Sequence, residues 1–113
     1  RAPLRPAADE LAPEPEAPEP ATASPSCDCG SARNRSEVAV CQDPGLAALD
    51  RQMASQFRSA MMQADRSQRR LLERTRGRFL SYRERCATNQ CIAETYRSRM
   101  REISDIMAGR WRG

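Results

Sequence analysis

The sequence contains no histidine and no lysine among its 113 residues. Histidine is the most frequent general acid or base in enzymes, and the lysine amine is a frequent nucleophile. Serines are present, but they have no such base to activate them. Two cysteines one residue apart, with a third further on, fit disulfides better than a zinc site. We therefore expect no catalytic activity, no cofactor and no metal ion.

Long apolar runs and aromatic side chains are scarce as well. No stretch approaches the roughly 20 consecutive apolar residues that cross a bilayer. The chain has only two Phe, two Tyr and one Trp. We expect no membrane span, and a core built from Met, Leu, Ile and Ala.

Proline and charge divide the chain into two parts. Seven of the eight prolines lie within residues 1–25. Segment 1–26 has five acids against two arginines and no apolar periodicity, so we expect a flexible, extended acidic tail. Residues 27–113 carry 17 arginines against ten acids, a net charge of +7, and are expected to form one small domain. Because the chain begins at Arg1 without a visible signal peptide, it is interpreted as a mature exported protein whose leader has been removed.

Capping residues and apolar periodicity divide residues 27–113 into four helices. Asn34 and Glu37 have capping-box spacing, and a short helix is expected to end near Gln42. Asp43 followed by Pro44 predicts the start of a long helix that continues to about residue 64. Two more helices are expected over about 66–86 and 90–108, from apolar residues that recur every three or four positions. Short connections between them predict an all-α antiparallel bundle of one short and three long helices.

The third helix is expected to have an apolar face and an opposite cationic face. The apolar face comprises Leu71, Leu72, Thr75, Phe79, Tyr82 and Cys86. The cationic face is a row of arginines spaced four residues apart, with one more on the same side: Arg66, Arg70, Arg74, Arg78 and Arg85. Such a row is interpreted either as a solvated face with weak ion pairs or as a docking surface for an anionic partner, such as an envelope polymer. Nucleic acid is not expected, because the interleaved aromatic and basic residues of single-strand binders are missing.

Two charged residues fall on apolar helix faces. Asp50 lies among the apolar positions of the second helix, and Arg99 lies among those of the fourth. Because an isolated buried charge is costly, each needs a partner. The sequence predicts that Asp50 and Arg99 face each other, with Arg83 as the alternative partner of Asp50. Near the chain end, Trp111 is expected to lie in a frayed segment.

Five cysteines in a small domain favour an oxidising, extracytoplasmic compartment. Cys86 and Cys91 flank the turn between the third and fourth helices, so a disulfide between them is predicted. Cys41 ends the first helix, and its partner is expected upstream, at either Cys29 or Cys27. Composition alone does not choose between these two.

Three stretches together resemble the LprI-like family of bacterial exported proteins. They are "DCGSARNRSEVAVCQDPGLAALD", "FLSYRERCATNQC" and "YRSRMREI", and they lie within a span of residues 28–103. The resemblance implies the disulfides Cys29–Cys41 and Cys86–Cys91, and it leaves Cys27 as the odd thiol. Cys27 is interpreted as a free or capped thiol, as a bridge to a second copy or another protein, or as a partner in exchange with Cys29 and Cys41.

The function expected from these features is that of a non-enzymatic exported binding protein, periplasmic or on the cell surface. The family resemblance implies inhibition of a lysozyme-type enzyme. The alternative is an accessory structural subunit of a bacterial envelope or membrane protein complex. That subunit would dock through its tail, its arginine face or Cys27.

Overall fold

The structure is a computed structural model that describes residues 29–113. The predicted tail, 1–26, and the predicted odd thiol, Cys27, lie outside the described residues. The described part begins with the short 3-10 helix η2 (Cys29–Ser31). The α-helices are α1 (Arg35–Gln42), α2 (Pro44–Gln63), α3 (Arg66–Arg85) and α4 (Asn89–Ala108). Because residues 29–113 contain no strand, the predicted all-α class is confirmed, and each predicted helix is present.

Capping side chains fix the starts of α1, α2 and α3, the first two at the residues that the sequence predicted. The Asn34 side chain accepts a hydrogen bond from the backbone N–H of Glu37 at the start of α1. The Asp43 side chain accepts from two backbone N–H groups in the first turn of α2. Asp65 and Gln68 form a reciprocal capping box at the start of α3. These side chains satisfy N–H groups that have no partner within their own helix, and so they fix where each helix begins.

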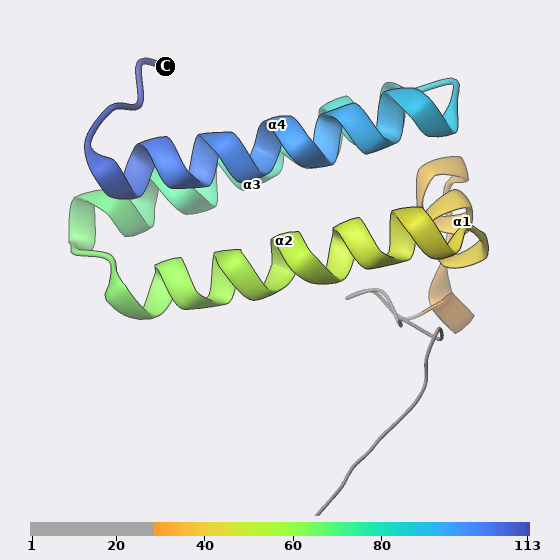
Figure 1. The fold of residues 1–113 in the computed structure, drawn as a ribbon, viewed down its shortest axis with the longest axis horizontal. Coiled ribbons are helices and arrows are strands. Elements are labelled where there is room, and N and C mark those ends of the chain that lie inside the picture. The colour runs from red at the N-terminus through yellow and green to blue at the C-terminus, as the bar shows by residue number, and fades with distance from the viewer. Residues whose placement is uncertain (1–28) are drawn as a thin grey trace, which may run out of the picture.

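Consecutive long helices run antiparallel, and α4 packs against both α2 and α3 (Figure 1). The short α1 lies across one end of the bundle, where it contacts α2 and α3. The connection between α2 and α3 and the end of α4 lie together at the opposite end. None of the helices in the described segment combines the length and the apolar character that crossing a membrane requires.

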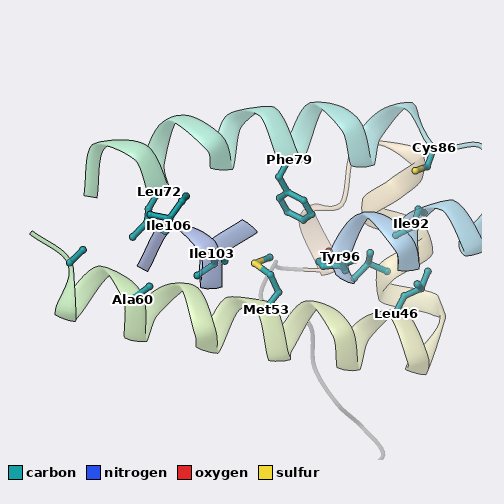
Figure 2. Close-up of a cluster of buried hydrophobic side chains, with 12 residues drawn as sticks. Leu46, Met53, Ala60, Leu72, Phe79, Cys86, Ile92, Tyr96, Ile103 and Ile106 are labelled. Atoms are coloured by element: carbon teal, nitrogen blue, oxygen red, sulfur yellow. The ribbon is translucent and has the colours of Figure 1, made fainter. Parts of the chain in front are cut away.

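The core follows the axis of the bundle between the three long helices (Figure 2). Phe79 of α3 meets Tyr96 of α4 edge to face, with ring centroids 5.2 Å apart. The other buried apolar side chains include Leu46, Met53 and Ala60 from α2, Leu72 from α3, and Ile92, Ile103 and Ile106 from α4. Val40 adds an apolar side chain from α1.

The predicted apolar face of α3 is wrong at Tyr82, whose side chain is 52% exposed, whereas its neighbour Arg83 is buried. At about 100° per residue, Arg83 lies closer than Tyr82 to the centre of the stripe formed by Leu72 and Phe79. Residue type favoured Tyr82 for the core, but angular position places Arg83 there.

Candidate binding site

The two buried charges do not pair as predicted. Within residues 29–113, Arg99 pairs with Glu102 rather than with Asp50. Asp50 instead accepts a hydrogen bond of 2.7 Å from the hydroxyl of Tyr96. Arg83, the alternative partner, donates to the same hydroxyl at 3.0 Å, so it reaches Asp50 through Tyr96. Helical periodicity identifies the buried face of a helix but not the neighbouring helix that a side chain meets, and Arg99 points toward α3.

The hydroxyl of Tyr96 therefore lies at the centre of a polar network that joins four helices. Asp50 belongs to α2, Tyr96 to α4 and Arg83 to α3. Arg83 also lies 3.9 Å from Glu37 of α1. Burial raises the pKa of Tyr96, which keeps the hydroxyl protonated as the donor to Asp50. Through Glu37 the network also reaches α1 at the end of the bundle.

Arg99 forms a second buried centre between α3 and α4. Its guanidinium donates to the Thr75 hydroxyl at 2.7 Å, to Glu102 at 3.0 Å and to the Leu72 carbonyl at 3.0 Å. It also lies 5.5 Å from the ring centroid of Phe57. Burial lowers the pKa of Arg99, and its hydrogen bond to Glu102 opposes that effect. Arginine stays charged despite such a shift, so this centre is a hydrogen-bonded buried cation.

Glu102 links the buried Arg99 to the surface. Its carboxylate accepts from Arg78 at 2.7 Å and from the indole nitrogen of Trp111 at 3.1 Å, in addition to Arg99. Trp111 also packs against the core, so the prediction that it lies in a frayed end is wrong. Partial burial by itself would raise the pKa of Glu102. The hydrogen bonds from Trp111, Arg78 and Arg99 outweigh it, and the pKa is lowered from its ordinary 4.5.

This lowered pKa predicts a loss of stability in acid. Because the carboxylate pKa is lower in the folded state, its contribution is present above pH 4.5 and disappears as the pH falls through the folded-state value. We expect Glu102→Gln to flatten the pH dependence of the free energy of unfolding below about pH 4.5, measured by urea titration. Glu94→Gln, on the exposed surface of α4, is the matched control and should leave this pH dependence unchanged. The same pH dependence in wild type and Glu102→Gln would contradict the lowered pKa of Glu102.

A groove of about 680 Å³ lies between α3 and α4, beside the Cys86–Cys91 disulfide. Tyr82 lines it, and the guanidinium of Arg85 lies 5.0 Å from the centroid of the Tyr82 ring. Arg78, Glu94, Thr95 and Ser98 are among the other lining residues. The groove thus has a half-exposed aromatic side chain at its rim, with arginines beside it.

The predicted arginine row lies on the exposed side of α3, and all five members are solvent-exposed: Arg66, Arg70, Arg74, Arg78 and Arg85. Two of them, Arg78 and Arg85, also line the groove. Within the described part of the chain, Arg66, Arg70 and Arg74 form no ion pair, whereas Arg78 pairs with Glu102. The row therefore continues beyond the groove as a surface of uncompensated positive charge.

Both disulfides that the resemblance implied are present. Cys29 is bonded to Cys41, which holds the start of the described chain against α1. Cys86 is bonded to Cys91 across the connection between α3 and α4. In residues 29–113 no group of three or more potential metal ligands lies close enough together to hold an ion.

The contacts made by three residues of these sites, Tyr96, Glu102 and Trp111, were not predicted from the sequence. Tyr96 has an aromatic ring that favours the core, and no local pattern shows that its hydroxyl is the centre of the first network. Glu102 carried a detectable signal, because it follows Arg99 by three positions and this spacing favours a helical ion pair. Trp111 carried none, because its bond to Glu102 depends on the chain turning back after Gly109, whose backbone has a φ of 77°.

Comparisons with protein-family models, with curated proteins and with solved structures gave no match for this chain. The LprI-like assignment therefore stays a prediction that rests on the quoted stretches of sequence.

Proposed function

We propose that this chain is a non-enzymatic, extracytoplasmic binding protein that inhibits a lysozyme-type glycosidase through the rim of the α3–α4 groove. The observation that carries the proposal is the exposed Tyr82 with Arg85 against its ring. Tyrosine and arginine are enriched among the residues that dominate binding energy at protein interfaces. The Cys86–Cys91 disulfide joins the end of α3, which carries Tyr82 and Arg85, to the start of α4. This link reduces the conformational entropy that the pair loses on binding.

The proposed target has a cleft of opposite charge. Glycosidases of this type carry a pair of carboxyl groups that flank the scissile bond. Arg85 is a cation at the rim of the groove that forms no ion pair within residues 29–113, and it matches such a cleft locally, whereas Arg78 beside it is paired with Glu102. The positive charge of the whole domain opposes association with a basic enzyme, so the match has to be local. The family resemblance supports the choice of a lysozyme, and the two disulfides support a location outside the reducing cytosol.

A titration of lysozyme activity on cell-wall substrate with the full chain tests the proposal. We expect lysis to fall in proportion to added protein and to reach its minimum near one equivalent. Tyr82→Ala combined with Arg85→Ala should raise the concentration needed by about 30-fold or more, the effect of losing an interface hot spot. Met62→Ala removes the most exposed large apolar side chain of residues 29–113, on α2, and should have no effect. Undiminished lysis at a tenfold excess of wild type would refute the proposal.

The alternative function, an accessory subunit of a bacterial envelope or membrane protein complex, is favoured by the charge of α3 and by the extra cysteine, Cys27. Purification from gently solubilised envelopes, with thiols trapped and without reduction, distinguishes it. A constant partner, or an intact mass that includes a second chain, would support the accessory role. A monomer with one trapped thiol would count against it.

A further inference from the structure

The positive charge of the bundle is concentrated on one helix. α3 contains eight arginines and two glutamates, a net charge of +6. By the same count the net charge of α2 is +1, and α1 and α4 each have a net charge of zero. Of the arginines on α3, Arg83 is buried in the polar network, and the row defined above lies on the exposed side. The charge is thus a property of one outer face rather than of the whole surface.

This charge works against the helix that carries it. Arg66, Arg70 and Arg74 follow one another at four-residue spacing, and like charges at that spacing destabilise a helix. The first turn of α3 contains no acidic residue, and Arg66 lies where the helix dipole is positive. No ion pair within residues 29–113 stabilises these three arginines, whereas a bound anion would.

We propose that the acidic segment 9–19 of this same chain docks along the arginine row, over Arg66, Arg70 and Arg74. The segment reads "DELAPEPEAPE" and holds five carboxylates and no basic residue. In a polyproline-type conformation of about 3.1 Å per residue, it would span about 31 Å. Arg66 and Arg74 lie eight residues apart on α3, about 12 Å along the helix, so the segment is long enough to cover all three arginines. Its charge is opposite to theirs.

The connection to the bundle permits this contact. The nine residues between the segment and Cys29 reach up to about 30 Å when extended. Cys29 is held by its disulfide to Cys41 at the end of α1, and Glu37 of α1 lies beside Arg83, near the end of α3. Arg74 is nine residues from Arg83, about 14 Å along the helix, so the connection reaches the nearer end of the three arginines. Tethering turns docking into an intramolecular step at an effective concentration in the millimolar range, so weak ion pairs can still keep the row covered. The consequence is that other polyanions must displace the segment before they reach α3.

The test uses the full chain and a variant with the five carboxylates neutralised, D9N/E10Q/E14Q/E16Q/E19Q. The probe is a fluorescent peptide of sequence DELAPEPEAPE, and its affinity is measured by anisotropy at low ionic strength. We expect the neutralised chain to bind the peptide at least about fivefold more tightly than wild type, because its row is uncovered. Adding Arg70→Glu and Arg74→Glu should abolish binding. Arg51→Glu with Arg101→Glu makes the same charge change on α2 and α4 and should preserve it.

Any of three other results would overturn the proposal. Equal affinity of both chains means that the segment leaves the row open. An absence of peptide binding to the neutralised chain, even if a phosphate polymer binds, means that the row selects another anion. A difference that grows with protein concentration assigns the segment to a second copy. The experiment contains no glycosidase and leaves Tyr82 unchanged, so its result is independent of the proposed inhibition.

Discussion

Replacing Arg99 by Ala is expected to lower the free energy of unfolding by about 3–5 kcal/mol, the range for emptying a large buried side chain that also makes hydrogen bonds. Three hydrogen-bond acceptors lose the guanidinium, among them Thr75 and the Leu72 carbonyl. The side chain also fills space beside Phe57 and Phe79, so alanine leaves a cavity between α3 and α4. Urea unfolding followed by far-ultraviolet circular dichroism, with the disulfides intact, measures the change.

Arg99→Met separates the two contributions. Methionine fills part of the cavity but makes none of the hydrogen bonds, so we expect it to recover about half of the loss. An Arg99→Ala protein as stable as wild type would show that the buried cation does not hold α3 and α4 together. If Arg99→Ala does not fold, the methionine variant still gives a measurable value.

Removing a single oxygen atom by Tyr96→Phe is expected to cost about 2–3 kcal/mol. The hydroxyl donates to Asp50 and accepts from Arg83, both buried and charged, and hydrogen bonds to charged groups are worth more than neutral ones. Tyr82→Phe is the matched control, because its hydroxyl belongs to a half-exposed side chain on α3. That change should stay within about 0.5 kcal/mol. Equal effects of the two substitutions in the same urea titration would contradict the network described for Tyr96.

The helices could be predicted because their signals are local. Asn34, Asp43 and Asp65 each cap the helix that follows within three residues of sequence. The arginine row could be predicted for the same reason, since four-residue spacing alone places side chains on one side of a helix. The Cys86–Cys91 disulfide closes a connection of four residues, so its formation required no knowledge of the tertiary arrangement.

The polar contacts could not be predicted, because they depend on how the helices meet. Asp50 and Arg99 both lie on buried faces, but one side chain faces Tyr96 and the other faces α3. The exposure of Tyr82 did have a sequence signal, because its angular position on α3 lies further than that of Arg83 from the centre of the apolar stripe. The groove itself has no sequence signal, because its walls come from two helices and the chain end, and its shape depends on their packing.

The proposed binding of a lysozyme-type enzyme by Tyr82 and Arg85 is tested most directly by calorimetric titration of the full chain into lysozyme. We expect saturable binding at one to one. Binding should be lost in Tyr82→Ala with Arg85→Ala and kept in Met62→Ala. An absence of binding by wild type, or unchanged binding by the double variant, would contradict it.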